Sequence, residues 1–361
     1  MSRVLNFNAG PSGIPLSVLE HAKDEFLSYK GLGYSIIEAS HRTPEFDEVI
    51  NKAIEKVRKL YGFGDEYAVL FLQGGASLQF AQIPMNLSTG RVCEYIDTDT
   101  WTKNAISEAR VLGVNVKVVA SSKESNFDHI PQTSESDFSS EADYTYICSN
   151  NTIQGTQFME FPKTKSTLVV DSSSDLFSRQ IETKDLGIFY GGVQKNGGPA
   201  GVTLVVIRRD LADRVDKTKI PSILRYSTQI EANSMSNTPN TFGIYMLDLM
   251  LDWVIKNGAL KGMEERNLAK AKVLYGAIDD MSEFYRGHAR KDSRSFMNAT
   301  FNLPSKDLES KFVDQAKQNA MIGLKGHRSV GGIRASIYNA VSLSDVETLV
   351  SFMREFAKKN G

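Results

Sequence analysis

Short apolar runs of β-branched and aromatic residues, separated in several places by helix-compatible segments, dominate the middle of this chain. Strands that are apolar along their whole length are buried on both faces, which is typical of a mostly parallel sheet. The pattern therefore predicts an α/β fold, with a mostly parallel sheet flanked by helices. The runs are YAVLFLQ (67–73), RVCEYIDT (91–98), NVKVVAS (115–121), YTYICSN (144–150), TLVVDSS (167–173), GIFYGG (187–192) and GVTLVVIR (201–208).

Helical periodicity occurs before, between and after these runs. Over residues 15–29 the apolar positions recur every three or four residues, which predicts an amphipathic helix that begins at a proline. Residues 47–60 have a similar pattern, and residues 101–112 are also compatible with a helix. The stretch 238–281 is helical in pattern but is broken near Asn257 and Gly258.

The pattern changes beyond that break. A strand-like FMNATFNL segment precedes a helix over about 306–321, a second strand around 333–338 and a last helix opened by the capping box Ser344-x-x-Glu347. A chain of 361 residues exceeds what one small core usually organises. We therefore expect a large domain over 16–258 and a smaller C-terminal α+β domain over 259–361, with residues 1–15 associated with the small domain.

Charge and cysteine usage exclude several classes of function. The chain has 42 basic and 43 acidic residues, so no global field attracts a nucleic acid or an anionic membrane. No apolar stretch approaches the roughly 18 residues of a membrane span, and the amino terminus lacks a signal-peptide pattern. Cys93 and Cys148 lie in apolar runs, where a small buried side chain is expected. We expect a cytoplasmic protein without a metal site.

In open α/β sheets, ligands bind beyond the carboxyl ends of the strands, so residues that follow the apolar runs are candidates for a site. Gly74-Gly75-Ala76-Ser77 follows the first run and precedes a helix-like segment, which suits a phosphate, although a plain strand-to-helix turn has the same pattern. Asp171 ends another run and is followed by three serines. An aspartate at this position can also simply form a turn.

Lys195 lies among small residues in VQKNGGPAG, between two apolar runs. A loop lysine is usually solvated, but one in an apolar setting has a lowered pKa and can form a Schiff base. A lysine, a strand-end aspartate and a phosphate-binding turn together meet the needs of pyridoxal phosphate, which has an aldehyde, a pyridine nitrogen and a phosphate. The combination therefore predicts this cofactor.

Two groups of cationic residues could bind the anionic ends of a substrate. His41 and Arg42 lie near the amino terminus, while His327 and Arg328 precede Arg334 in the predicted small domain. Each would by itself be taken as a solvated side chain. Together they could bind carboxylate or phosphate, because guanidinium matches both in bidentate geometry.

Several longer motifs, spread over nearly the whole chain, resemble the phosphoserine aminotransferases, which are class V pyridoxal-phosphate-dependent aminotransferases with the type I fold. The resemblance implies transamination between O-phospho-L-serine with 2-oxoglutarate and 3-phosphohydroxypyruvate with L-glutamate, in serine biosynthesis. The motifs are NFNAGPSGIP (6–15), ASHR (39–42), VLFLQGGASLQF (69–80), NNTIQGTQF (150–158), VVDSSSD (169–175), VQKNGGPAG (193–201), SMSNTPNTF (234–242) and KGHRSVGGIRASIYNA (325–340).

The resemblance also implies roles for individual residues. Lys195 would bind the cofactor aldehyde and move the proton, and Asp171 would pair with the pyridine nitrogen. The remaining cofactor contacts would come from Ala76 and Ser77 at the phosphate, Trp101 stacked on the ring, Thr152 and Gln194 beside it, and Asn237 and Thr238 from a neighbouring subunit. A homodimer with shared active sites follows from this set.

For the substrate, the resemblance gives Arg334 to the α-carboxylate. It gives His41, Arg42, His327 and Arg328 to the phosphate, the first two from the partner subunit. The same cationic pocket would accept the γ-carboxylate of glutamate, which makes ping-pong transfer through one site possible.

Three other interpretations compete with this one. Another class V enzyme of the alanine–glyoxylate type would not need the paired histidines and arginines. A cysteine desulfurase needs an accessible thiolate, whereas Cys93 and Cys148 lie in apolar runs. A non-catalytic nucleotide-binding α/β protein would use the glycine turn for phosphate and leave Lys195 solvated.

Overall fold

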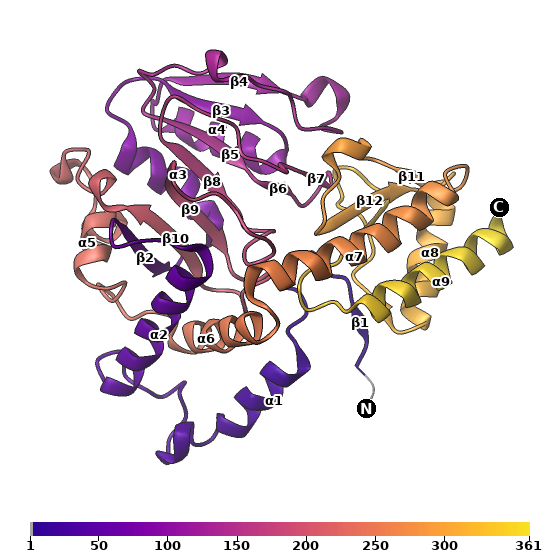
Figure 1. Ribbon diagram of the computed structural model, residues 1–361, viewed down its shortest axis with the longest axis horizontal. Helices are drawn as coiled ribbons and strands as arrows, with labels where there is room; N and C mark the ends of the chain where they lie inside the picture. The colour runs from indigo at the N-terminus through magenta and orange to yellow at the C-terminus, as the bar shows by residue number, and fades with distance from the viewer. Residues whose placement is uncertain (1–2) are drawn as a thin grey trace.

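The seven apolar runs form the seven strands of one central sheet, as predicted (Figure 1). The computed structural model describes residues 3–361. The strand order is β2–β10–β9–β8–β5–β3–β4, and only β10 is antiparallel to its neighbours. The strands are β2 (Tyr67–Leu72), β3 (Cys93–Asp97), β4 (Val116–Ser121), β5 (Tyr144–Cys148), β8 (Leu168–Asp171), β9 (Leu186–Gly192) and β10 (Thr203–Arg208).

The antiparallel direction of β10 follows from its connection. Residues 193–202 link β9 to β10 without a helix, and a link this short returns the chain antiparallel beside the strand it left. This link carries Lys195. The parallel strands β2, β9, β8, β5 and β3 therefore all end at the edge of the sheet where the lysine lies.

Helices cover both faces of the sheet, and alternate strand residues enter different cores. On β8, Val170 packs in a core with residues of α2 and α6, whereas Val169 packs with residues of α3 and α4 on the other face. This burial of both faces explains why the strands are apolar throughout. The helices are α1 (Leu16–Glu25), α2 (Pro44–Tyr61), α3 (Gly75–Leu87), α4 (Thr100–Val111), α5 (Tyr226–Glu231) and α6 (Thr241–Lys256).

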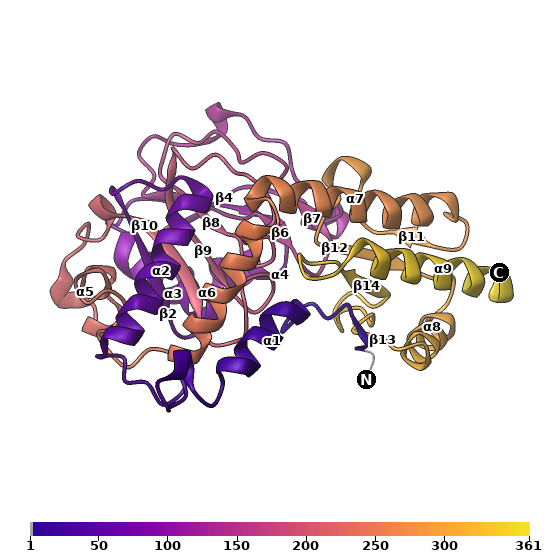
Figure 2. The same ribbon diagram turned by 60° about the horizontal axis from the view of Figure 1, so that its bottom comes forward.

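The predicted break at Asn257 and Gly258 separates α6 from α7, which spans Ala259–Asp280. Gly258 has a φ of 92°, a left-handed conformation that favours glycine. Helix α7 leads into a smaller unit with its own core (Figures 1 and 2). The other elements of this unit are β11 (Arg286–Gly287), β12 (Asn298–Asn302), α8 (Lys306–Gln318), β13 (Met321–Ile322), β14 (Ile333–Ser336) and α9 (Leu343–Asn360).

The amino-terminal segment joins this smaller unit. Strand β1 (Leu5–Asn6) pairs in parallel with β13, and Phe7 is buried in the core of the smaller unit. Helix α7 contributes Leu260 and Met263 to the core that α2 and α6 form on the central sheet. It contributes Ala271 and later residues to the core of the smaller unit. We therefore propose that the domain boundary lies within α7, a few residues beyond the predicted position 258. The prediction for residues 1 and 2 lies outside the described residues.

The capping box predicted at Ser344 and Glu347 is wrong. Helix α9 begins two residues earlier, where Ser342 accepts the N–H of Asp345 and the Asp345 carboxylate accepts the N–H of Ser342. The hydroxyl of Ser344 instead lies 2.8 Å from that of Ser342. Two overlapping Ser-x-x-acid patterns satisfy the same rule, and the helix uses the first.

A short hairpin of β6 (Asn150–Asn151) and β7 (Thr156–Gln157) follows β5.

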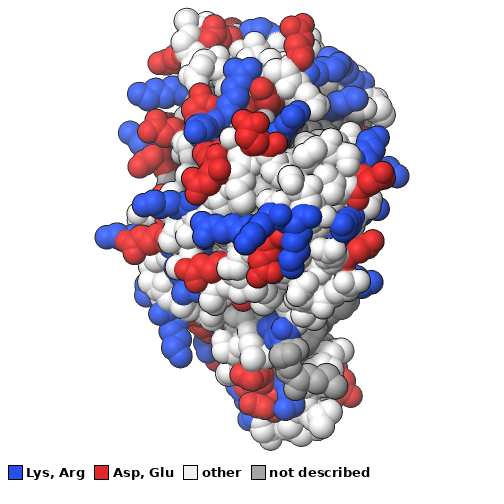
Figure 3. Space-filling view, turned by 90° about the vertical axis from the view of Figure 1, so that its right-hand side faces the viewer, with Lys and Arg blue, Asp and Glu red and all other residues white. Residues whose placement is uncertain are grey.

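No helix within residues 3–361 is long and apolar enough to cross a bilayer. On the face of the molecule in Figure 3, basic and acidic side chains are interspersed, and neither sign covers it. This distribution agrees with the near-zero net charge of the chain.

A buried lysine joins α7 to the end of β14. The Lys270 amine donates hydrogen bonds to the carbonyls of Ile337 at 2.8 Å and Tyr338 at 2.7 Å. Burial, together with the positive charge of Arg266, lowers the pKa of Lys270 to about 7, although Asp345 opposes the shift. Between about pH 7 and the ordinary lysine pKa, the unfolded chain therefore binds one more proton than the folded protein.

The stability of the wild type should therefore rise with pH over this window. Relative to Lys270→Met, we expect its free energy of unfolding to rise by up to about 1.4 kcal/mol per pH unit between pH 7 and 9. Urea unfolding at both pH values measures the difference. Lys272→Met, which changes an exposed lysine of the same helix, should follow the wild type. Parallel pH profiles of the wild type and Lys270→Met would contradict the burial of a neutral amine.

Candidate active site

The segments that follow β2, β3, β5, β8 and β9 surround one cavity of about 350 Å³ at the carboxyl edge of the sheet. Two residues of the smaller unit, His327 and Arg334, complete its lining. The structure thus brings together nine of the residues predicted for the site. They are Ala76, Ser77, Trp101, Thr152, Asp171, Gln194, Lys195, His327 and Arg334.

Lys195 lies within this cavity and has few polar neighbours. Its amine donates a hydrogen bond to the Thr152 hydroxyl at 2.7 Å and lies 5.8 Å from the centre of the Trp101 ring. Burial lowers the pKa of Lys195, although the charge of Asp171 opposes the shift. A lysine with a lowered pKa has a larger neutral fraction and can attack a carbonyl carbon.

The amino-terminal segment supports the backbone of this lysine. The Ser12 hydroxyl donates a hydrogen bond to the carbonyl of Lys195. Gly10 has a φ of 133°, and a Cβ there would lie 3.2 Å from Lys195 Cγ. A side chain at position 10 would therefore be strained and would press on the lysine.

Asp171 is buried at the end of β8 and has three hydrogen-bond donors. Its Oδ1 accepts the N–H and the hydroxyl of Ser173 at 2.9 and 2.6 Å, and its Oδ2 accepts the Tyr190 hydroxyl at 3.2 Å. Burial raises the pKa of Asp171, while these donors and the Lys195 charge counteract the rise. The site therefore holds a carboxylate whose charge depends on specific donors.

The glycine turn after β2 forms the start of α3, as predicted. Gly74 and Gly75 have φ values of 91° and 68°, which favour glycine. Ala76 and Ser77 follow in the first helical turn and line the cavity. Their N–H groups have no partner within the helix, and the helix dipole favours an anion at this end.

Trp101 is positioned by the cap of α4. The Asp99 carboxylate accepts the N–H of Thr102 at 2.8 Å, which places Trp101 in the first turn beside the cavity. Burial, with a contribution from the charge of Asp171, raises the pKa of Asp99 to about 7.

Arg334 and His327 line the cavity from the smaller unit. Arg334 extends from β14, and its buried Nε has no hydrogen-bond partner within residues 3–361. His327 Nδ1 lies 2.6 Å from the Ser329 hydroxyl, and burial, with the charges of Arg334 and Arg328, lowers the pKa of His327. An incoming anion would meet both groups.

Five predicted residues lie outside this cavity. Arg42, Arg328, Asn237 and Thr238 are exposed, and His41 is partly exposed. The Thr238 carbonyl accepts a hydrogen bond from Gln73 at 2.8 Å, just before the glycine turn. Asn237 lines a separate hollow with Gln73 and Gly74.

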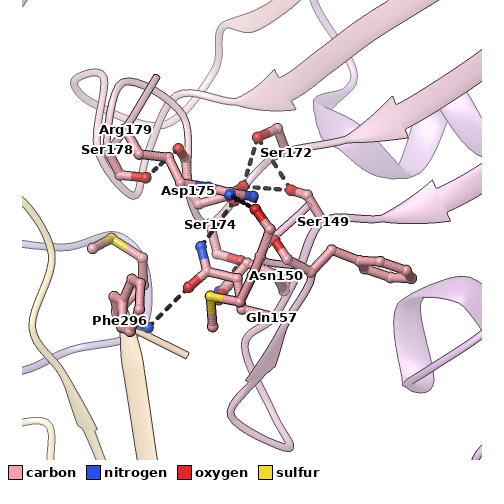
Figure 4. A network of polar contacts seen from close by, with 12 residues as sticks. Ser149, Asn150, Gln157, Ser172, Ser174, Asp175, Ser178, Arg179 and Phe296 are labelled. Atoms are coloured by element: carbon pink, nitrogen blue, oxygen red, sulfur yellow. Dashed lines mark hydrogen bonds and ion pairs between the residues drawn. The ribbon is translucent and has the colours of Figure 1, made fainter. Parts of the chain in front are cut away.

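A polar network beneath the cavity was not predicted (Figure 4). Asp175 accepts the hydroxyls of Ser149 and Ser172, both at 2.5 Å, and the Gln157 amide at 3.2 Å. Arg179 lies 3.6 Å from the same carboxylate. Because Ser149 precedes the hairpin that carries Thr152 and Gln157 lies in its second strand, Asp175 joins the segment after β5 to the segment after β8.

Asn150 extends this network toward the smaller unit. Its amide donates to the Ser174 hydroxyl at 2.7 Å and to Asn298 Oδ1 at 2.8 Å, and its Oδ1 accepts the Ser295 hydroxyl. Asn150 and Ser174 also line the cavity. Their place directly after strand ends was the only sequence signal that could have identified them.

The comparisons with known proteins agree with this geometry. The chain matches the family model for aminotransferase class-V over residues 4–349. The chain therefore belongs to the class V aminotransferase family, as the motifs indicated.

The chain is similar over nearly its full length to three phosphoserine aminotransferases. A phosphoserine aminotransferase of Campylobacter jejuni subsp. doylei is 56% identical over 358 residues, which cover 99% of each chain. The solved phosphoserine aminotransferase from Bacillus circulans subsp. alkalophilus is 45% identical, with a TM-score of 0.96 over 99% of each chain. The pyridoxal-phosphate-bound phosphoserine aminotransferase from Trichomonas vaginalis is 37% identical, with a TM-score of 0.93 over 98% of this chain and 100% of that one.

The residues present fit pyridoxal phosphate, the cofactor of this enzyme. The cavity volume falls within the roughly 300–1,000 Å³ typical of ligand pockets. Trp101 Nε1 and Arg334 Nε are buried, and neither has a partner among the described residues. The cavity also presents an amine, a carboxylate and the free N–H groups of a helix start, which match the aldehyde, ring nitrogen and phosphate of the cofactor.

We expect Asp175→Asn to destabilise the protein by about 3 to 5 kcal/mol, because it removes the negative charge beside the buried Arg179 and turns Oδ2, the acceptor of the Gln157 amide, into a second donor. Urea unfolding of the wild type and the variant measures this loss. Asp185→Asn removes the charge of an exposed carboxylate and serves as the control. Equal stabilities of the two variants would contradict a structural role for Asp175.

Proposed function

We propose that this enzyme is a phosphoserine aminotransferase. It would transfer the amino group of O-phospho-L-serine reversibly to 2-oxoglutarate, which gives 3-phosphohydroxypyruvate and L-glutamate. The observation that carries the proposal is the cavity that Lys195 lines together with His327 and Arg334. The high identity to phosphoserine aminotransferases over the full chain supports it. The reaction would serve serine biosynthesis.

When bound, pyridoxal phosphate supplies an electron-withdrawing ring that accepts the electron pair left at the substrate Cα after proton removal. Lys195 would hold its aldehyde, Asp171 its ring nitrogen, and Ala76 and Ser77 its phosphate. Trp101 would stack on its ring, with Thr152 and Gln194 beside it. The neutral Lys195 amine would then take the proton from the substrate Cα, and burial favours that neutral form.

Arg334 is assigned to the substrate α-carboxylate. His327 and Arg328, which lie at the start of the turn that leads into β14, are assigned to the phosphate end by the family resemblance. A γ-carboxylate carries negative charge at the same end as the phosphate, so the same residues would accept glutamate in the second half-reaction. Ping-pong transfer through one site follows.

The rival interpretations explain fewer of the observations. Burial raises the pKa of Cys93 to about 11 and that of Cys148 well above its ordinary value, which leaves no thiolate for a desulfurase at neutral pH. An alanine–glyoxylate type enzyme has no use for His327 and Arg328.

A coupled assay with phosphoserine and 2-oxoglutarate, run beside alanine and aspartate as donors, tests the proposal. A preference for alanine or aspartate would overturn it.

The proposal includes a homodimer with shared active sites, in the cytosol. Its support is the position of His41, Arg42, Asn237 and Thr238 outside the cavity of their own chain, although the resemblance assigns them to cofactor or substrate. Two buried free cysteines agree with a reducing compartment.

Arg334→Ala should lower kcat/KM for both phosphoserine and glutamate, because both carry the α-carboxylate. Loss of a buried charged contact costs about 2 to 5 kcal/mol, or roughly 30-fold to several thousandfold. Arg328→Ala should reduce kcat/KM for phosphoserine at least as much as for glutamate. Steady-state kinetics with each substrate decides, and an unchanged kcat/KM for Arg334→Ala would contradict its assignment.

Mixing two inactive variants tests the shared site. A hybrid of a Lys195→Ala subunit and an Arg42→Ala subunit would contain one site with both native residues, so activity should return when the subunits exchange. Each variant alone should remain weakly active or inactive. Sedimentation of the wild type as an active monomer, or no recovery in a mixture whose hybrids are detected by native mass spectrometry, would contradict the dimer proposal.

A further inference from the structure

Two buried tyrosines lie in a row with Asp171 on adjacent strands. Tyr146 belongs to β5, Asp171 to β8 and Tyr190 to β9, and Asp171 pairs directly with Tyr190 in the ladder. Both phenols lie in the core shared with α3 and α4. The hydroxyls of Tyr146 and Tyr190 are 2.8 Å apart, and that of Tyr190 is 3.2 Å from Asp171 Oδ2.

The direction of these hydrogen bonds is fixed by the carboxylate. An ionised carboxylate only accepts, so the single hydroxyl hydrogen of Tyr190 points to Asp171. Tyr146 must then donate to the Tyr190 oxygen. Burial raises the pKa of both phenols well above the ordinary value, so both remain donors at neutral pH. Such chains of hydrogen bonds strengthen one another in a buried setting.

The two oxygens of Asp171 differ in their support. Oδ1 accepts two hydrogen bonds from Ser173, whereas Oδ2 accepts one, from Tyr190, among the interactions within residues 3–361. The carboxylate is buried, and burial favours its neutral form. Removal of the Tyr190 hydroxyl would therefore make Asp171 retain a proton more readily.

We propose that Tyr190, supported by Tyr146, is a positioning residue that keeps the Asp171 carboxylate ionised and directed toward the ring nitrogen of pyridoxal phosphate. The inference rests on the proposed function, in which Asp171 faces that nitrogen. If Asp171 keeps the shared proton, the ring nitrogen loses it and withdraws electrons from the reacting carbon less strongly. Tyr190 would thus act on the chemical step without touching the substrate.

The test compares three phenylalanine variants of the holoenzyme. Tyr190→Phe removes the donor to Asp171, and Tyr146→Phe removes the second link. Tyr144→Phe is the matched control, because its hydroxyl lies on the same strand as Tyr146 but bonds to Tyr95 at 2.6 Å. Each holoenzyme is loaded with pyridoxal phosphate labelled with ¹⁵N in the ring, and its ¹⁵N NMR resonance is compared with the wild type.

Tyr190→Phe should move the ring-nitrogen resonance toward the unprotonated position and lower kcat about tenfold, with KM for phosphoserine changed less than about twofold. Tyr146→Phe should move the resonance less, in the same direction, and Tyr144→Phe should not move it. Equal resonances in Tyr190→Phe and Tyr144→Phe would overturn the inference, as would equal shifts in all three variants.

Asp171→Ala separates this inference from the proposed function on which it rests. If that variant leaves the ring-nitrogen resonance unchanged, Asp171 does not face the nitrogen and the assignment within the proposed function fails. If Asp171→Ala shifts the resonance and Tyr190→Phe does not, only the role of Tyr190 fails.

Discussion

The site depends on keeping a lysine amine and an aspartate carboxylate together in one buried cavity. Removing a charge from water costs several kcal/mol, so each group needs compensation from its neighbours. The Thr152 hydroxyl accepts from Lys195, and Ser173 and Tyr190 donate to Asp171. Burial shifts the two pKa values in opposite directions, and the mutual attraction of the charges limits both shifts.

Buried hydrogen bonds between the larger and the smaller unit contribute to this arrangement. Arg334 belongs to the smaller unit but faces the cavity of the larger one. Beyond its strand, the N–H of Asn339 donates to the Asn196 side chain at 2.9 Å, next to Lys195, and the Asn339 amide donates to the Phe177 carbonyl at 2.8 Å. These contacts fix the arginine relative to the lysine by buried hydrogen bonds.

Most of the fold could be predicted from local sequence, because strands buried on both faces are apolar throughout. The antiparallel direction of β10 could have been inferred from its short helix-free connection, whereas the true cap of α9 could not, since two overlapping patterns satisfy the same rule. Lys195, Asp171 and the glycine turn were identified because they follow strand ends.

Other parts of the site depend on pairing between distant segments. Trp101 and Thr152 were assigned only through the family resemblance, because neither residue stands in a local sequence pattern that indicates a binding site. Asp175 and Tyr190 look like a loop residue and a core residue until strand pairing brings them beside Ser149 and Asp171.

We propose that Lys195 is the amine that binds pyridoxal phosphate. Reduction of the holoenzyme with borohydride fixes the cofactor covalently to the lysine that holds it, and peptide mass spectrometry then locates the modified residue. The structure predicts modification at Lys195 in a single peptide. Modification at another lysine, or an unmodified Lys195 in protein saturated with cofactor, would contradict the claim.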